Sequence, residues 1–332
     1  MSKKPLETWL ALNLMYIKAN QADLAYNGAM KPDYVQQAVA PLAKRSAAEA
    51  TATARALFAL TKPRLAFFTI LTAIATYVAT ADGHGLLHAC VTLFGASCSA
   101  GGALSLNQWL ERELDARMER TCQRPLPARQ VSPRSALLFS ASLSFIGILT
   151  LGTMVSPISA FLALTTILVY GFVYTPLKRR TRWATEIGAL SGALPPLIGT
   201  AATGNPTAPI GISLFLIILI WQMPHFYAIG WRYRADYRNA GFRLLSTRDY
   251  DGRKTARWTL GYSLALLALP IVLYGFGLAA LPLLIAATLA GSDLTLAAFR
   301  FCRSKSEQSS KRLFFATIRY LPIALTGACI PY

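Results

Sequence analysis

Long apolar runs separated by short polar segments fill the chain from about residue 65 to its end. A helix needs roughly 20 apolar residues to cross a bilayer, because the hydrocarbon core is about 30 Å thick and each residue rises about 1.5 Å. Nine runs have about this length, and they predict helices over Leu65–Ala81, Leu86–Leu106, Ser135–Val155, Ile158–Pro176, Thr185–Gly204, Ala208–Gly230, Trp258–Gly277, Ala279–Phe299 and Leu313–Ile330. The pattern therefore predicts an all-α fold, a polytopic membrane bundle of about nine transmembrane helices.

The fifth of these runs is the least regular, since it contains Gly188, Gly192, Pro195, Pro196 and Gly199. In a soluble protein these residues would argue against a helix. Inside a membrane bundle, small residues let neighbouring helices approach closely, and the kink at a proline can be accommodated. We therefore expect a helix here as well.

Positive charge is confined to segments that join alternate helices. Only 14% of the residues are charged, and Lys and Arg outnumber Asp and Glu by 33 to 15. Of these 33 residues, 32 lie before the first helix or after the second, fourth, sixth and eighth helices. Basic loops stay on the cytoplasmic side. We therefore expect a multi-pass protein of a bacterial plasma (inner) membrane with a cytoplasmic N-terminus, whose basic surface meets lipid and not nucleic acid.

The first 60 residues differ from the rest of the chain, because they are polar to amphipathic and lack the apolar core of a signal peptide. No arginine precedes Arg45, whereas Glu7, Asp23 and Asp33 are present, which argues against a mitochondrial transit peptide. A disordered tail, a peripheral helix and a partner contact are all compatible with this segment. We therefore divide the chain into a cytoplasmic extension, 1–60, and a transmembrane domain, 61–332.

Two carboxylates and an amide follow the second predicted helix at helical spacing. Asn107, Glu111 and Asp115 are four residues apart, so they share one face if the helix continues past the membrane surface. Magnesium prefers such oxygen ligands and usually sits between one or two carboxylates and a substrate phosphate. Arg120 and Arg124 follow, and guanidinium groups bind phosphate oxygens. The pattern indicates a magnesium-bridged diphosphate, although interleaved acids and arginines also form salt bridges on solvated helix ends.

The loops after the fourth and sixth helices hold further candidates. Lys178 and Arg179 could add cations to the same diphosphate, or could anchor the helix at the basic face. His225 lies near the cytoplasmic end of an apolar helix, where it could bind haem iron or hydrogen-bond a neighbouring helix. A second acidic group facing the first could be formed by Asp236 together with Asp249 or Asp251.

Two charged residues lie in the interior of predicted helices, well away from the helix ends: Asp293 in the eighth and Arg319 in the ninth. Charged side chains within a membrane usually pair with one another. We therefore expect an ion pair that fixes how these two helices pack.

The stretch Asn107–Pro125 resembles the first Asp-rich signature of the UbiA superfamily of intramembrane prenyltransferases, roughly N-x-x-x-D-x-x-x-D followed by R-T-x-x-R-P. The resemblance is closest to the branch that farnesylates protohaem IX, in which the middle position is Glu or Asp. Further matches are Thr61–Arg64, Tyr174–Arg179, Trp221–Phe226, Asp236-Tyr237 and Asp251–Arg253, so the resemblance covers about Leu60 to Tyr332. The chain departs from the pattern at Ala235, where many relatives carry an acid, and at Pro127-Ala128, where a basic residue is more usual.

This resemblance implies a UbiA-like fold and transfer of farnesyl from farnesyl diphosphate to a vinyl group of haem b, with Mg²⁺ as cofactor and haem O and diphosphate as products. It implies that haem O-modifying or oxidase assembly proteins are partners. The implied metal ligands, which also act in catalysis, are Asn107, Glu111, Asp115 and Asp236. The implied substrate-binding residues are Arg120, Arg124, Lys178 and Arg179 for the diphosphate, with His225 for haem.

Three alternatives stay open. Another member of the superfamily would prenylate a quinone precursor or a chlorophyll-type acceptor, against which the Trp221–Phe226 stretch argues. A haem or small-molecule transporter would line a pathway across the membrane with its charges, whereas here nearly all charges fall on one side. A structural membrane subunit would not need so dense a polar cluster.

Overall fold

The structure, a computed structural model, describes residues 49–330. Within this range the chain is helical apart from turns and loops and contains no strand. The chain divides into two units, Met1–Ala56 and Leu57–Tyr332, and the second unit is the helix bundle. The predicted extension 1–60 lies largely outside the described residues, so that domain division stays a prediction.

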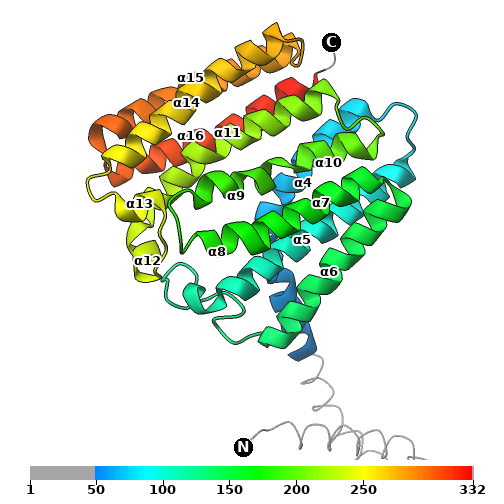
Figure 1. Cartoon of the computed structure of the whole chain (residues 1–332), viewed down its shortest axis with the longest axis horizontal. Coiled ribbons are helices and arrows are strands. Elements are labelled where there is room, and N and C mark those ends of the chain that lie inside the picture. The colour runs from blue at the N-terminus through cyan, green and yellow to red at the C-terminus, as the bar shows by residue number, and fades with distance from the viewer. Residues whose placement is uncertain (1–48, 331–332) are drawn as a thin grey trace, which may run out of the picture. The chain divides into compact units, whose positions relative to one another are not determined.

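The bundle is built from long helices that run side by side, joined by short loops and short helices (Figure 1). Several begin with proline in their first turn, where the missing N–H costs nothing. The elements are α4 (Pro63–Thr80), α5 (Leu86–Asp115), α6 (Pro133–Met154), α7 (Pro157–Leu168), the π-helical segment η1 (Val169–Tyr174), α8 (Thr175–Leu177), α9 (Ala184–Ala193), α10 (Pro195–Ala202), α11 (Pro209–Arg232), α12 (Arg234–Asn239), α13 (Leu245–Arg248), α14 (Arg253–Gly275), α15 (Leu281–Ser304) and α16 (Glu307–Cys329).

Each of the nine predicted runs is helical, but the count of nine spanning helices is not confirmed. Seven helical stretches of the described chain are long and apolar enough to cross a membrane: α4, α5, α6, the continuous stretch Pro157–Leu177, α11, α14 and α15. The fifth predicted run consists of two short helices, α9 and α10. The ninth, α16, is a single helix that is not among the seven.

The fifth run is broken at Leu194, directly before Pro195, because a proline in a helix interior removes a hydrogen bond and clashes with the preceding turn. Its second half, α10, packs tightly on α4. A Cβ atom on Gly199 would lie 2.1 Å from the carbonyl oxygen of Ala73 and 2.3 Å from Oγ1 of Thr76. Glycine at this position therefore permits the close approach that the small residues of this run suggest.

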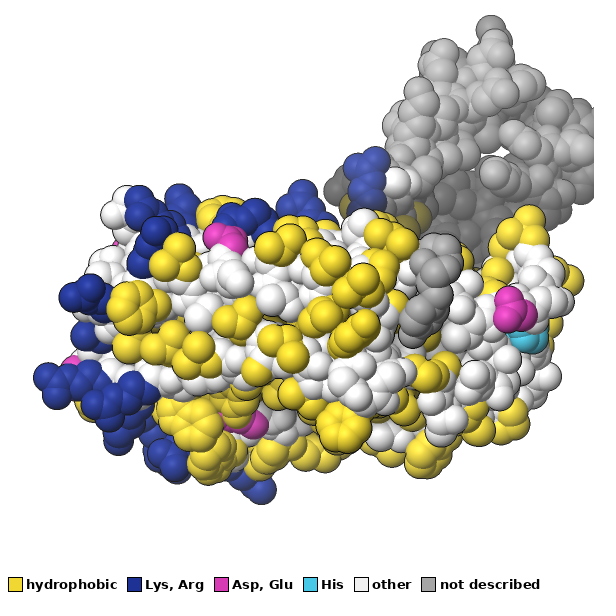
Figure 2. All heavy atoms as spheres, turned by 90° about the horizontal axis from the view of Figure 1, so that it is seen from above, with side chains coloured by type: hydrophobic (Ala, Val, Ile, Leu, Met, Phe, Trp, Pro, Cys, Tyr) yellow, Lys and Arg dark blue, Asp and Glu magenta, His cyan; other side chains and the backbone are white. Residues whose placement is uncertain are grey.

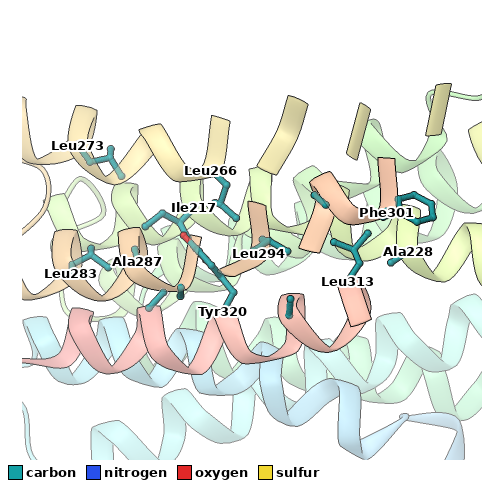
Figure 3. Packing of buried hydrophobic residues seen from close by; sticks show 14 of the residues in the cluster. Ile217, Ala228, Leu266, Leu273, Leu283, Ala287, Leu294, Phe301, Leu313 and Tyr320 are labelled. Atoms are coloured by element: carbon teal, nitrogen blue, oxygen red, sulfur yellow. The ribbon is translucent and has the colours of Figure 1, made fainter. Parts of the chain in front are cut away.

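The largest hydrophobic cluster joins α11, α14, α15 and α16 (Figure 3). Tyr320 of α16 is fully buried and lies among Leu294 of α15 and other aliphatic side chains of the neighbouring helices. Buried alanines, such as Ala287 and Ala324, keep the helices close together. This half of the bundle is therefore held mainly by apolar packing.

Basic side chains gather at one end of the bundle, and the flank of the helices is largely hydrophobic (Figure 2). The same end carries α12, α13 and the turns that follow α5 (Figure 1). A backbone hydrogen bond of 2.7 Å from the Arg243 N–H to the Lys178 carbonyl joins the loop after α12 to the end of α8. Loops far apart in the sequence therefore meet at the basic end.

Candidate active site

The second predicted helix continues beyond its apolar part, as the spacing of its polar residues requires. Helix α5 extends to Asp115 and carries Asn107, Glu111 and Asp115 on one face. All three side chains are buried, with exposed fractions of 1%, 5% and 1%. Thr121 Oγ1 donates to the Asp115 carbonyl at 2.9 Å and closes the turn after the helix. Buried carboxylates need compensating partners, so the surrounding cations define the site.

Glu111 is paired with Lys178 from the end of α8. Lys178 Nζ donates to Glu111 Oε1 at 2.8 Å, and both side chains are largely buried. The ammonium group also lies 4.4 Å from the centre of the Tyr174 ring. Burial alone would lower the pKa of Lys178, but the Glu111 carboxylate outweighs it and raises that pKa above its usual value. Lys178 is therefore a permanent cation at this site.

Asp115 is paired with Arg124, which follows it by nine residues. Arg124 Nη1 donates to Asp115 Oδ2 at 2.7 Å. The second carboxylate oxygen, Oδ1, is buried and has no hydrogen-bond partner among the described residues. An acceptor left in this state costs about 1–3 kcal/mol or more, so a metal ion or another electron-pair acceptor would stabilise it.

Asn107 is held by two residues from other helices. Lys62 Nζ donates to Asn107 Oδ1 at 3.1 Å, and Asn107 Nδ2 donates to Thr175 Oγ1 at 3.0 Å. Lys62 precedes α4 with φ of 48°, in the left-handed region that costs a non-glycine residue about 1–3 kcal/mol. Burial and the nearby charge of Arg124 lower the pKa of Lys62 to about 7. A bound anion would favour its charged form.

Arg120 and Asp236 lie on a second wall of the site, formed by the turns after α5 and by α12. The Arg120 backbone N–H donates to Asp236 Oδ2 at 3.4 Å. The Arg120 guanidinium donates to the Tyr237 hydroxyl at 2.9 Å and lies over the rings of Tyr233 and Tyr237. Arg120 is thus tethered by aromatic rings and leaves guanidinium N–H groups for an anion.

The second acidic group does not assemble against the first one. Asp249 is buried and accepts the Thr255 N–H at 2.6 Å, whereas the exposed Asp251 pairs with Arg253 at 3.1 Å. In residues 49–330 no group of three or more His, Cys, Asp or Glu side chains is arranged to hold a metal. Asp236 therefore does not form such a group with the two α5 carboxylates. The Arg179 side chain is exposed, and no side-chain contact joins it to the site within these residues.

His225 lies outside this cluster, between α11 and α16. Its Nδ1 is 2.9 Å from Thr317 Oγ1, and its ring stacks between Trp221 and Phe314, with ring centres 5.1 and 5.2 Å away. The hydroxyl of Thr317 donates to the Phe314 carbonyl at 2.6 Å. Thr317 Oγ1 therefore accepts a hydrogen bond from the Nδ1–H group of His225, which leaves the lone pair of the ring on Nε2.

These residues suit a divalent metal and a polyanion together. One face of α5 carries the side-chain oxygen atoms of Asn107, Glu111 and Asp115. Of these atoms, Asp115 Oδ1 has no hydrogen-bond partner among the described residues. Lys62, Lys178 and Arg124 lie around the two α5 carboxylates, and Arg120 lies beside Asp236 on the α12 wall. An excess of cations beside carboxylates is the arrangement expected for an anion that arrives with its own counter-ion.

Sequence reasoning missed Lys62 and Thr175 as members of the site. The signal for Lys62 was its place in the Thr61–Arg64 stretch, directly before Pro63 at the start of a helix. The signal for Thr175 was weaker, since a threonine beside Pro176 at the end of a helix is common. Each contacts Asn107 from a different helix, which only the tertiary structure brings together.

The fold and the site define an integral membrane helix bundle of the kind that binds diphosphate esters at its basic end. The chain belongs to the UbiA prenyltransferase family, whose model matches residues 66–319. It is thus an intramembrane prenyltransferase, and its class of substrate is a prenyl diphosphate.

Curated relatives match over most of their length. The chain is 38% identical over 272 residues to a protoheme IX farnesyltransferase of Opitutus terrae, covering 82% of this chain and 92% of the relative. It is 40% identical over 243 residues to the protein of the same name from Sorangium cellulosum, covering 72% of this chain and 86% of the relative.

Solved structures confirm the fold. A digeranylgeranylglyceryl phosphate synthase superposes with a TM-score of 0.69 at 15% identity, covering 83% of this chain and 97% of the other. A UbiA homolog from Archaeoglobus fulgidus, bound to DMAPP and Mg²⁺, has a TM-score of 0.59 at 14% identity, covering 83% and 99% of the two chains. At these identities the likeness concerns the fold.

Proposed function

We propose that this chain transfers the farnesyl group of farnesyl diphosphate to a vinyl group of protohaem IX (haem b), giving haem O, in a reaction that requires Mg²⁺. The observation that carries the proposal is the pair of buried carboxylates on α5, each joined to one cation, with one carboxylate oxygen unpartnered. The names of the curated relatives support the identity of the acceptor. Haem-copper oxidases would use the product.

The side chains around α5 would stabilise the departing diphosphate. Asn107, Glu111 and Asp115 would hold the metal, and a bound divalent cation neutralises charge on diphosphate oxygens. Lys178 and Arg124 are already fixed by the carboxylates, so little reorganisation is needed when negative charge develops near them. Arg120 would bind the anion from the α12 wall, and the exposed Arg179 would add positive charge to the same end of the bundle. Asp236 would act from that wall as the further acidic ligand.

The reaction breaks the carbon–oxygen bond of the allylic ester, and diphosphate leaves with both electrons. The vinyl π electrons of the porphyrin form the new carbon–carbon bond to the farnesyl cation. Water then adds to the resulting cation and releases a proton, which leaves a hydroxyl group. The chain's cations lower the cost of the first step, and its apolar helices would keep water from reaching the farnesyl cation early.

His225 would bind haem through Nε2. The hydrogen bond between Nδ1 and Thr317 favours the tautomer with a free Nε2 lone pair, as a second contact commonly does for iron-ligating histidines. The rings of Trp221 and Phe314 hold the imidazole in place and provide flat apolar surface for a porphyrin.

Replacing His225 with Ala is expected to weaken haem binding at least tenfold, since both an iron ligand and part of the aromatic stack are lost. Titration of the purified protein with haem, followed by its Soret absorbance, measures the change. Thr317→Val is the matched variant: it keeps the imidazole but removes its orienting hydrogen bond, so a smaller loss is expected. Unchanged haem affinity and turnover in His225→Ala would exclude this role.

The basic end of the bundle would face the cytoplasm of a bacterium, with the protein spanning the plasma (inner) membrane several times and the N-terminus cytoplasmic. The gathering of Lys and Arg at one end supports this orientation (Figure 2). Lipid surrounds the apolar flank, and enzymes that modify haem O or oxidase assembly proteins would receive the product. Residues 1–60 would form a separate cytoplasmic extension to the transferase domain, 61–332.

The product itself tests the proposal. Purified protein is incubated with haem b, farnesyl diphosphate and Mg²⁺, and mass spectrometry seeks haem plus a hydroxyfarnesyl unit, with chelator as the control. Prenylation of a quinone precursor instead of haem would show that the acceptor is different, whereas the prenyl diphosphate donor and its ionisation would be the same. No transfer to any acceptor by folded protein would contradict the proposal and favour a transporter.

Replacing Lys62 with Met is expected to raise the KM for farnesyl diphosphate about tenfold with a smaller effect on kcat, because one cation that contacts Asn107 is lost. Steady-state kinetics at saturating haem measure this. Arg64→Met removes an exposed cation two residues away and should leave KM within twofold. Equal effects of the two changes would show that Lys62 acts only through general surface charge.

A further inference from the structure

A groove of about 410 Å³ runs along α14 near the start of the helix. It is lined by Arg257, Trp258, Gly261, Tyr262 and Ala265, which share one face of α14. A Cβ atom on Gly261 would meet no atom within 4 Å. Close packing therefore does not require glycine at this position, and the missing side chain leaves the groove open.

A second arginine–tryptophan pair adjoins the groove. Arg182 and Trp183 directly precede α9, and the Trp183 ring meets Trp258 edge-on with the ring centres 5.5 Å apart. The Arg182 guanidinium lies 4.7 Å from the centre of the Trp183 ring. Arg257 directly precedes Trp258. Two Arg-Trp pairs from distant parts of the chain are therefore joined through their tryptophan rings.

The polar groups of these two pairs are donors without partners. Neither Arg182 nor Arg257 has a carboxylate within ion-pair distance in residues 49–330. The indole N–H groups of Trp183 and Trp258 have no hydrogen-bond partner in the same range, whereas that of Trp221 donates to a carbonyl at 2.8 Å. Because guanidinium and indole groups only donate, a ligand here has to supply acceptor oxygens.

Other charged groups of the helices are already satisfied. The exposed Arg319 on α16 donates to Asp293 Oδ2 on α15 at 2.5 Å, so the ion pair predicted from the sequence is confirmed. In α9, Glu186 accepts a hydrogen bond from the Tyr227 hydroxyl, and its second oxygen is buried. The donors of the two Arg-Trp pairs therefore remain available to a molecule outside the chain.

We propose that the groove binds an anionic phospholipid of the leaflet at the basic end of the bundle. Its phosphate would lie against Arg182 and Arg257, because guanidinium groups bind phosphate oxygens, and basic pockets beside membrane helices hold anionic headgroups. One acyl chain would follow Gly261 and Ala265, which lie about 6 and 12 Å deeper along α14 than Arg257. The tryptophan N–H groups would donate to ester carbonyls at the interface, the depth that tryptophan favours.

The lipid would also stabilise the turn that carries Lys178 of the active site. Trp183 follows Lys178 by five residues, and the turn between them is held by the Arg180 and Thr181 N–H groups, which donate to the Leu177 carbonyl at 2.9 and 3.0 Å. Anionic lipid is therefore expected to raise the rate of prenyl transfer. This effect on the rate rests on the proposed function, whereas binding of the lipid does not.

Lipid titration tests the site. The full chain is delipidated in detergent and titrated with phosphatidylglycerol or with zwitterionic phosphatidylcholine, and native mass spectrometry counts the lipids bound. Phosphatidylglycerol should bind at least tenfold more tightly, and R182Q/R257Q should remove this preference. R300Q/R303Q removes two exposed arginines from α15 and should change the affinity less than threefold. Inorganic phosphate should not displace the lipid, because phosphate has no acyl chain for the groove.

Filling the groove tests the acyl-chain part of the site without a change in charge. Gly261→Leu should raise the dissociation constant for phosphatidylglycerol at least tenfold, with a Tm no lower than that of the wild type. Gly275→Leu is the matched control, since Gly275 also lies in α14 with open space beside it and should bind lipid like wild type. Equal affinities for the two lipids would overturn the proposal, as would unchanged binding in Gly261→Leu, equal losses in the two arginine double variants or displacement by phosphate.

Discussion

Asp115→Ala is expected to lower the rate of prenyl transfer by at least about 10²–10³-fold, the cost typical of losing one preorganised group that stabilises transition-state charge. The variant loses the unpartnered oxygen that fits the metal, and it also leaves Arg124 without its carboxylate. Product is measured by mass spectrometry of the haem fraction over a range of Mg²⁺ concentrations. If Asp115 is a metal ligand, the Mg²⁺ concentration that gives half of the maximal rate should be higher in the variant than in the wild type.

Glu113→Ala is the matched control for Asp115→Ala. Glu113 lies on the same helix two residues away, but its side chain is 77% exposed and pairs with Arg112 at 3.3 Å. Its removal should leave the rate within twofold. Retained activity in Asp115→Ala, or equal losses in both variants, would contradict the assignment of the α5 stripe as the metal site.

Lys178→Met is expected to destabilise the protein by about 3–5 kcal/mol, because it leaves the Glu111 carboxylate buried without its cation. Thermal unfolding in detergent should show a clear fall in Tm. Prenyl transfer should fall as well, since the same ammonium group would bind the diphosphate. The proposed function and the stability of the site thus rest on one side chain.

A second substitution separates these two effects. Adding Glu111→Gln to Lys178→Met removes the unpaired charge, so much of the lost stability should return while activity stays low. Arg253→Met is the matched control, since it breaks an exposed pair with Asp251 and should cost about 0–1 kcal/mol. Full recovery of activity in the double variant would mean that Lys178 serves the structure alone and that Glu111 is not a metal ligand.

Several features of the site could be foreseen from local sequence. The spacing of Asn107, Glu111 and Asp115 predicts one helical face, and α5 does extend to Asp115 with all three on that face. Helical periodicity depends on neighbouring residues, so it can be read along the chain. The partners of these side chains could not be foreseen in the same way. Lys178 reaches Glu111 from 67 residues away, and Lys62 reaches Asn107 from 45 residues away.

The contacts of the second acidic group also could not be foreseen from the sequence. Asp249 and Asp251 have the right chemistry, but each satisfies a nearby backbone N–H in the turn that starts α14. Short polar side chains often bond their own backbone in this way. Sequence gives the residue types, whereas the turn decides whether their oxygens face a substrate or the chain itself.

The sequence by itself determined the all-α membrane class, the positions of the helices along the chain and which loops between them are basic. These features depend on the length, apolarity and charge of continuous segments. Only the tertiary structure decided that Lys62 and Thr175 join the site, and that the Asp293–Arg319 pair faces outward. Each of these depends on which helices approach one another and on which face of each helix remains uncovered. Such contacts join residues distant in sequence and leave no periodic signal along the chain.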